Sequence, residues 1–157
     1  MVRHAKSSWA IAGQADFDRP LNDRGHRDAP VMAERLLDAN IKIDAFISSP
    51  ANRALTTASY FAKAYGLHKK DIHQHKELYH AMPPTFMEMA CTIDDEVKTA
   101  AMFSHNPGIT AFVNLLTATH IDNMPTCGIF AVKADIKHWK EFRSAKKEFW
   151  FFDCPKG

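Results

Sequence analysis

Short apolar runs alternate along the chain with longer segments in which apolar residues recur at helical spacing. Apolar runs that include β-branched or aromatic side chains are typical of buried strands, and they occupy residues 45–48, 99–103, 128–132 and 149–152. A weaker candidate strand covers residues 72–75. The helical spacing predicts helices over residues 22–39, 51–64 and 107–117, and a further one after Pro83 and Pro84.

The order of the predicted elements favours an α/β domain. Strands followed by helices predict a three-layer α/β/α sandwich, in which a mostly parallel central sheet is covered on both faces. A shorter connection, which contains Trp139 and Phe142, joins the last two strands, so we expect an antiparallel edge there. Pro30 lies inside the first helix and is expected to kink it or to mark where its regular part begins. A length of 157 residues fits one domain over residues 1–157.

Composition and charge argue against several classes of protein. Twenty basic and eighteen acidic residues give a net charge of +2, which is too balanced to favour nucleic acid or an anionic membrane as a partner. No apolar run approaches the roughly 18 residues of a membrane span, and no signal-peptide pattern follows the first residues. Three widely spaced cysteines argue against a disulfide framework or a zinc ribbon and favour a reducing cytosol: Cys91, Cys127 and Cys154. We therefore expect a cytoplasmic protein.

Cationic or imidazole side chains stand at three junctions where a predicted strand meets the segment after it. Arg3 and His4 form the first junction, and Arg53 and His105 follow two of the apolar runs. Two residues precede Arg3, so its strand is either unusually short or begins upstream of this chain. Because ligands of open α/β sheets bind beyond the carboxyl ends of the strands, we expect the three junctions to converge on one site.

These residue types suit a phosphoryl group. It carries nearly two negative charges, which guanidinium groups bind through paired hydrogen bonds. Ser49 is predicted to cap a helix that starts at Pro50, and the N–H groups of such a helix start add donors. A histidine between these cations attacks phosphorus to form a phosphohistidine, and the cations stabilise the transition state. Taken singly, an Arg-His pair occurs by chance and a Ser-Pro helix start is ordinary capping, but the three junctions together indicate His4 as a nucleophile beside Arg3.

Four segments follow one another in order along nearly the whole chain: residues 2–9 (VRHAKSSW), 16–25 (DFDRPLNDRG), 48–58 (SSPANRALTTA) and 105–108 (HNPG). Together they resemble the motifs of the histidine phosphatase (phosphoglycerate mutase-like) superfamily, and within it those of the SixA-type phosphohistidine phosphatases. The resemblance implies a phosphoglycerate mutase-like fold and a phosphohydrolase that needs neither a metal nor an organic cofactor.

The resemblance also implies a role for each matching residue. His4 would be the phosphorylated nucleophile, and three side chains would form the phosphate pocket around it: Arg3, Arg53 and His105. Arg19 would add a contact to the phosphate or the substrate, and Lys6 and Asn106 are lesser candidates for such a contact. In many superfamily members a glycine follows the Arg-His pair, whereas this chain has Ala5.

The proton donor to the leaving group is the weakest match, and Glu77 is its candidate. Water-like oxygen leaving groups have pKa values near ~15.7 and need a proton. An imidazole leaving group has a pKa of about 6.5 for its cation and leaves with little help. A weak acid match is therefore more compatible with cleavage of an N–P bond than with cleavage of a simple phosphate ester.

Three functions remain open from the sequence. The leading one is a phosphohistidine phosphatase whose partner is a phosphorylated signalling protein of the histidine phosphotransfer type. The second is a phosphatase of a small phosphorylated substrate, which would require Glu77 as its acid. The third is a non-catalytic module that binds a phosphorylated ligand, although the presence of both His4 and His105 argues against it.

Other candidate features are weaker. Four histidines form a loose cluster without a diagnostic ligand spacing, so we interpret them as part of a basic surface rather than a metal site: His68, His73, His75 and His80. Trp9 closely follows the nucleophile motif and is a candidate for the rim of the substrate site, as is Trp139.

Overall fold

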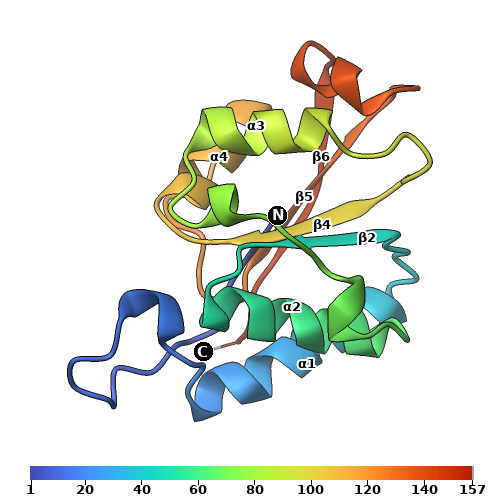
Figure 1. The fold of residues 1–157 in the computed structure, drawn as a ribbon. Coiled ribbons are helices and arrows are strands. Elements are labelled where there is room, and N and C mark those ends of the chain that lie inside the picture. Colours follow the sequence, from blue (N-terminus) through green and yellow to red (C-terminus); the bar gives the residue numbers. More distant parts are fainter. Residues whose placement is uncertain (157) are drawn as a thin grey trace.

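Three layers make up the computed structural model, which describes residues 1–156 (Figure 1). A six-stranded sheet in the order β3-β2-β4-β1-β5-β6 forms the middle layer. Its strands are β1 (Val2–Arg3), β2 (Ala45–Ser48), β3 (His73–Gln74), β4 (Ala100–Ser104), β5 (Ile129–Ala134) and β6 (Lys147–Asp153). Helices α1 (Asp23–Asp38) and α2 (Asn52–Ala64) cover one face, and α3 (Pro83–Cys91) and α4 (Gly108–Leu116) cover the other. The predicted α/β/α sandwich is confirmed.

The pairing of the strands separates a parallel part from an antiparallel edge. Strands β3, β2, β4 and β1 pair in parallel, whereas β5 pairs antiparallel with both β1 and β6. The expected antiparallel edge is therefore present. The strand that carries Arg3 has two residues and lies between β4 and β5, with Val2 opposite Phe103 on one side and Ile129 on the other. The first basic junction thus starts from the interior of the sheet.

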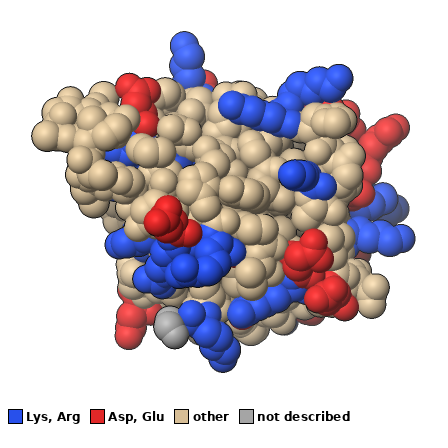
Figure 2. Space-filling model, turned by 90° about the horizontal axis from the view of Figure 1, so that it is seen from below, with Lys and Arg blue, Asp and Glu red and all other residues tan. Residues whose placement is uncertain are grey.

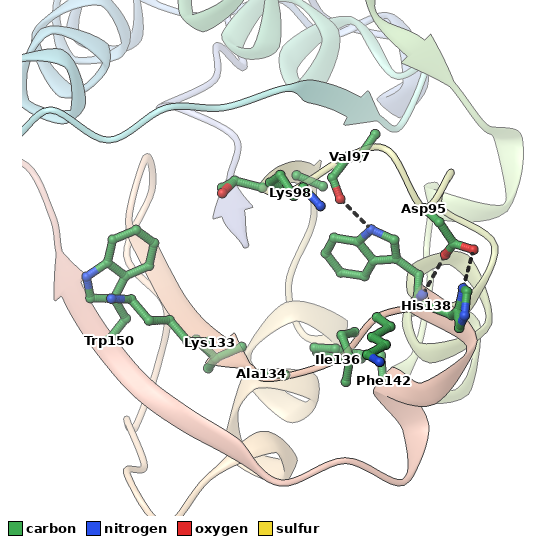
Figure 3. Close-up of a pocket in the computed structure, with 14 residues that line it drawn as sticks. Asp95, Val97, Lys98, Lys133, Ala134, Ile136, His138, Phe142 and Trp150 are labelled. Atoms are coloured by element: carbon green, nitrogen blue, oxygen red, sulfur yellow. Dashed lines mark hydrogen bonds and ion pairs between the residues drawn. The ribbon is translucent and has the colours of Figure 1, made fainter.

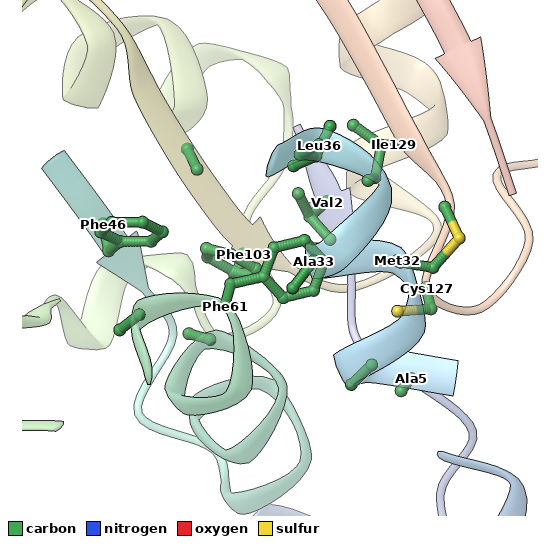
Figure 4. Packing of buried hydrophobic residues seen from close by; sticks show 14 of the residues in the cluster. Val2, Ala5, Met32, Ala33, Leu36, Phe46, Phe61, Phe103, Cys127 and Ile129 are labelled. Atoms are coloured by element: carbon green, nitrogen blue, oxygen red, sulfur yellow. The ribbon is translucent and has the colours of Figure 1, made fainter. Parts of the chain in front are cut away.

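Aromatic side chains fill the space between the sheet and its helices. On the side of α1 and α2, Phe61 packs edge-on against Phe103 with ring centroids 5.1 Å apart, and Phe46 lies in the same cluster (Figure 4). On the other side, Phe86 of α3 packs against Phe112 of α4 with centroids 5.3 Å apart. Burial of such side chains is the main source of stability for the three layers.

Two helices differ in detail from the sequence prediction. Helix α1 runs through Pro30 without ending there, and its start is capped by the Asn22 side chain, which accepts from the N–H of Gly25. Helix α2 begins at Asn52, one residue after the start of the predicted range 51–64, and Pro50, which was expected as a first helical residue, lies before the helix. The Ser49 hydroxyl still accepts from the Ala51 N–H at 3.2 Å, and it also lies 2.8 Å from Nε2 of His105.

Four 3-10 turns connect these elements: η1 (Asp16–Asp18), η2 (Lys69–Asp71), η3 (Lys76–Leu78) and η4 (Trp139–Arg143). Turn η1 belongs to the long segment between β1 and α1, which stands out from the body of the molecule in Figure 1. Within residues 1–156, every helix is too short or too polar to cross a membrane.

Candidate active site

The carboxyl ends of the adjacent strands β1, β4 and β2 bring the three basic junctions together, as predicted. His4 follows β1, and its backbone is held on both sides: its N–H donates to Ser104, and its carbonyl accepts from Cys127. His105 follows β4, and the rings of His4 and His105 have centroids 5.2 Å apart. Both side chains are almost fully buried, with 7% and 4% exposure.

The hydrogen bond of the His4 ring determines which nitrogen is free. His4 Nδ1 lies 2.8 Å from the carbonyl oxygen of Ala5. A carbonyl oxygen accepts but cannot donate, so Nδ1 carries the proton and Nε2 of the neutral ring keeps its lone pair. Burial is the main cause that lowers the pKa of His4 to about 4, and the charges of Arg53, Arg3 and Arg19 lower it further. At neutral pH the ring is uncharged, and the lone pair of Nε2 is available to attack phosphorus.

The His105 ring has a hydrogen-bond donor, Nδ1, that no described residue accepts from. Its Nε2 lies 2.8 Å from the Ser49 hydroxyl, which already accepts from the Ala51 N–H. Among the described residues the Ser49 hydroxyl has no other acceptor, so we assign its proton to the bond with Nε2, which leaves the proton of the neutral ring on Nδ1. That Nδ1 is buried and has no hydrogen-bond partner among the described residues. Burial, followed by the proximity of His4 and Arg53, lowers the pKa of His105 to about 3.

Arg3 supplies a second unpartnered donor. One of its terminal nitrogens donates to the carbonyl of Met124 at 2.8 Å, whereas its buried Nε has no partner among residues 1–156. A buried donor without a partner costs free energy unless a ligand or water satisfies it. Together with His105 Nδ1, the Arg3 Nε indicates a place for an acceptor-rich ligand beside His4.

The carboxylate of Asp16, in η1, joins two more arginines. Asp16 Oδ1 lies 3.0 Å from Arg19 and Oδ2 lies 2.9 Å from Arg53, which also donates to the Asp16 carbonyl. Tyr79 donates its hydroxyl proton to Oδ2 at 2.6 Å. This hydrogen bond is the main cause that holds the pKa of Asp16 well below its usual range, and those from Arg53 and Arg19 act in the same direction. Asp16 is therefore ionised at neutral pH.

The guanidinium of Arg19 is held by hydrogen bonds at its edge and by an indole ring on its face. Its Nε donates to the carbonyl of Ser8, and one terminal nitrogen donates to the Ser7 hydroxyl. The indole ring of Trp9 covers the guanidinium, with 3.3 Å between the ring centroid and Cζ. The indole itself is 77% exposed. Trp9 thus contacts Arg19 and lies at the surface beside it, and its role at the rim of the substrate site stays a prediction.

Residues behind the site fix its geometry. Thr57 of α2 accepts from the N–H of Ala5 at 2.9 Å and donates to the carbonyl of Arg53 at 2.7 Å, so one hydroxyl joins the segment after His4 to the start of α2. Gly25 of α1 lies against the carbonyl of Lys6, where a Cβ would collide with that oxygen. The glycine of the predicted motif is thus explained by a close backbone approach.

Two of the predicted residues, Lys6 and Asn106, have weaker connections to the site. Lys6 is exposed, and its side chain makes no hydrogen bond or ion pair with any described residue. The Asn106 amide is fully used, because it donates to Asn123 and Met124 and accepts from Thr110. Asn106 and Arg3 both donate to the Met124 carbonyl, which favours a role for Asn106 in positioning Arg3.

Glu77 is exposed in η3, and within residues 1–156 its side chain is not bonded to the other site residues. Its assignment as the acid stays a prediction. The side chain that reaches the site from this segment is Tyr79, whose ring lies 5.5 Å from that of His105. Ser104 donates to the Leu78 carbonyl at 2.6 Å and so holds this segment against β4.

Four contributors to the site were not predicted to contact other site residues, although Ser49 was expected to cap a helix: Asp16, Ser49, Thr57 and Tyr79. Three of them stand inside the motif segments, which was the available signal. Among the described residues, His, Cys, Asp and Glu side chains form no group of three or more that is able to hold a metal ion.

Comparison with known proteins agrees with this geometry. The family model of the histidine phosphatase superfamily (branch 1) matches residues 1–82, slightly more than half of the chain. The chain belongs to this superfamily and is a phosphohydrolase of the histidine-nucleophile class.

Individual relatives extend the match over the whole chain. An uncharacterised protein of Mycobacterium leprae is 30% identical over 99% of this chain and 100% of its own length. The crystal structure of an Agrobacterium tumefaciens protein assigned as the phosphohistidine phosphatase SixA has a TM-score of 0.83 and 27% identity, with 99% of this chain and 96% of that chain covered. The protein histidine phosphatase SixA complexed with tungstate has a TM-score of 0.81 and 21% identity, with 97% and 93% covered, and shows the same fold. The predicted resemblance to SixA-type proteins is confirmed.

Proposed function

We propose that this protein is a phosphohistidine phosphatase that removes phosphate from a phosphohistidine-bearing signalling protein, with His4 as the nucleophile. The observation that carries the proposal is the His4 ring, whose Nδ1 donates to the Ala5 carbonyl and leaves Nε2 free. The cationic and donor groups that a phosphoryl group requires lie around that ring.

The chemistry has two steps. His4 Nε2 attacks phosphorus as the bond between phosphorus and the substrate nitrogen breaks, and the electron pair of that bond returns to the substrate ring. The phosphorylated His4 ring keeps its Nδ1 proton, and the Ala5 carbonyl stabilises the resulting positive charge. Water then attacks phosphorus, the electron pair of the N–P bond returns to Nε2, and the protons of the water pass to the phosphate and solvent.

The net positive charge of the side chains around His4 is similar in size to the negative charge of a phosphoryl group. Three guanidinium charges, from Arg3, Arg19 and Arg53, and one carboxylate charge, from Asp16, leave a net charge of +2. A phosphoryl group with nearly two negative charges balances this excess. The unpartnered donors at Arg3 Nε and His105 Nδ1 add hydrogen bonds to its oxygens.

The proton donors near the site favour an imidazole leaving group. Asp16 is ionised and therefore not an acid, and burial together with Asp16 raises the pKa of the Tyr79 hydroxyl. A substrate imidazole takes a proton from solvent on its second nitrogen, because its pKa of about 6.5 lies near neutrality, and then leaves as a neutral ring. An alkoxide has no such route. This supports N–P cleavage over hydrolysis of alkyl phosphates.

The surface beside the site supports a protein substrate. Three apolar side chains of the segment between β1 and α1 are exposed: Trp9 at 77%, Ile11 at 60% and Phe17 at 38%. Exposed apolar groups gathered beside a site are typical of protein interfaces. Figure 2 shows a group of basic side chains on the side of the molecule formed by α1 and α2, which would complement an acidic partner surface. A histidine phosphotransfer-type domain in the cytoplasm is the partner that we propose.

The test is a comparison of two substrates. A histidine phosphotransfer domain phosphorylated on histidine and glycerol 3-phosphate, an alkyl phosphate, are each given to the wild type and to His4→Ala. We expect faster turnover of the phosphohistidine protein by the wild type and a loss of about 10³-fold or more in His4→Ala. We also expect acid-labile, alkali-stable phosphate to be trapped on the wild type and absent from His4→Ala. The exposed His120 provides the control variant His120→Ala, which should retain activity.

Each other outcome identifies a different function. Faster turnover of the alkyl phosphate overturns the proposed substrate class and requires an acid. Glu77→Gln, compared with Glu96→Gln at another exposed position, then shows whether Glu77 is that acid. If neither substrate turns over and no phosphate is trapped, the protein is a binding module and the proposal is wrong.

A further inference from the structure

A second pocket lies at the opposite end of the sheet from His4. It has a volume of about 350 Å³ and lies between the segment that enters β4 and the strands β5 and β6 (Figure 3). Ala100, the first residue of β4, lines this pocket, whereas His105 follows the last residue of β4. At roughly 3.3 Å per residue, the two places are separated by about 17 Å along the strand. The pocket is therefore distinct from the candidate active site.

One wall of this pocket is held rigidly. The indole N–H of Trp139 donates to the Val97 carbonyl at 2.8 Å. The Asp95 carboxylate accepts from the backbone N–H of Trp139 at 2.8 Å and from His138 Nδ1 at 2.9 Å. Figure 3 shows these three interactions along one side of the pocket. A fixed indole presents a flat apolar surface without a further loss of side-chain entropy on binding.

A second indole forms the facing part of the pocket. Trp150 of β6 is 37% exposed, and the Lys133 ammonium lies 4.3 Å from the centroid of its ring. Buried Phe142 also lines the pocket. A smaller apolar cavity of about 120 Å³ shares Trp139, Phe142 and Trp150 and extends toward the core. Together, the two cavities provide aromatic and apolar surface that a ligand with an aromatic ring would contact.

The charged groups of the pocket have an excess of cations. Lys98, Lys133 and Lys137 line it, and its carboxylate, Asp95, is already bonded to two donors. Figure 3 shows Lys98 beside Val97 on the segment that enters β4, and Lys133 on β5 next to Trp150. Three ammonium groups around an aromatic pocket favour a ligand with negative charge and disfavour a cation.

We propose that this pocket binds a small aromatic anion, with its ring against the two indoles and its carboxylate or phosphate beside the lysines. Pockets that combine aromatic and apolar surface with polar and charged groups are typical of small-molecule sites. The site acts independently of the chemistry at His4, so the proposal stands or falls separately from the proposed phosphatase function.

The test uses 2-naphthoate as the probe and the uncharged 2-naphthamide as its matched analogue. The chain has three tryptophans, and their indole N–H signals in NMR spectra report separately on the two ends of the molecule. We expect saturable shifts of the Trp139 and Trp150 signals with 2-naphthoate and an unchanged Trp9 signal. Binding of 2-naphthamide should be about threefold to fivefold weaker, because it lacks the charge that the lysines attract.

Lysine variants separate charge recognition from packing. Lys98→Met and Lys133→Met should each weaken 2-naphthoate about threefold and leave 2-naphthamide unchanged. Lys70→Met, at an exposed position in η2, is the control and should bind like the wild type. Equal affinity for the acid and the amide, a shift of Trp9 as large as that of the pocket indoles, or no saturable shift would each overturn the proposal.

Discussion

The Asp16 carboxylate lies between Arg19 and Arg53 and is bonded to both. Under the proposed function it would compete with the phosphoryl group for the guanidinium N–H groups, and it also holds the two arginines while the site is free of ligand. The competition weakens phosphate binding, whereas the positioning of the two arginines favours it. The stability of the free protein depends on the positioning alone. The consequences of removing the carboxylate are therefore separable by measuring the protein with and without phosphate.

Asp16→Asn should lower the stability of the free protein and increase its affinity for inorganic phosphate. The free energy of unfolding should fall by about 1–2 kcal/mol, because two nearly buried guanidinium groups lose their charged partner. Saturating phosphate should remove most of this difference in thermal denaturation. Asp18→Asn, at an exposed neighbour, is the control. Phosphate affinity that is equal or weaker in Asp16→Asn would contradict the competition between the two anions.

Thr57 tests whether the backbone behind the nucleophile controls catalysis. Thr57→Val keeps the shape of the side chain but removes the acceptor for the Ala5 N–H and the donor to the Arg53 carbonyl. We expect a loss of about 1–3 kcal/mol in stability and a fall of about tenfold in kcat, because a small displacement of a reacting group costs rate. Thr56→Val removes an exposed hydroxyl that donates to the Asn52 side chain, so it should change stability by less than about 0.5 kcal/mol and leave kcat unchanged.

At the scale of elements, the approach of α1 to the segment after β1 depends on a glycine. Gly25→Ala should push α1 away from the Lys6 carbonyl, and we expect a stability loss of about 1–3 kcal/mol from overpacking together with reduced kcat. Gly66→Ala provides the comparison. Gly66 has a φ of +78° but open space around it, so its variant should be strained and still fully active. Full activity of Gly25→Ala would show that this contact does not position His4.

The exposed segment between β1 and α1 should matter for a protein substrate and not for a small one. Ile11→Ala removes an apolar group that is 60% exposed in this segment. We expect a higher KM for the phosphohistidine protein and an unchanged kcat/KM for free phosphohistidine, because the small substrate does not extend to Ile11. Leu115→Ala, at an apolar position on α4 that is 73% exposed, is the matched control. A change with both substrates would place Ile11 in the site itself.

The elements that the sequence predicted well are those with strong local patterns. The runs at β2 and β4 are continuous apolar strands, and the helix after each shows clear helical spacing, so their positions and the convergence of Arg53 and His105 followed from local reasoning. The bracing of Arg53 by Asp16 joins residues 37 positions apart, and the contact of Tyr79 with Asp16 joins residues 63 apart. Such contacts depend on tertiary packing, which local patterns do not encode.

At the scale of the whole molecule, two buried neutral imidazoles make stability depend on pH. The pKa values of His4 and His105 are lowered to about 4 and about 3, mainly by burial, whereas both rings titrate near pH 6.5 when the chain is unfolded. Between these values the unfolded chain binds more protons than the folded chain, so a fall in pH favours unfolding. The stability that the neutral rings provide is complete above about pH 6.5 and is lost as the pH falls toward 4.

Replacing one of these rings should therefore flatten the pH dependence of unfolding. His105→Gln cannot gain the proton that the wild type gains on unfolding, so its free energy of unfolding should decline less between pH 7 and pH 4.5, by as much as roughly 3 kcal/mol. Urea denaturation at several pH values measures this slope. His120→Gln, which changes an exposed ring, should keep the slope of the wild type. An unchanged slope in His105→Gln would mean that this ring takes up its proton over the same pH range in the folded and the unfolded protein. The lowered pKa that burial gives the ring in the folded protein would then be wrong.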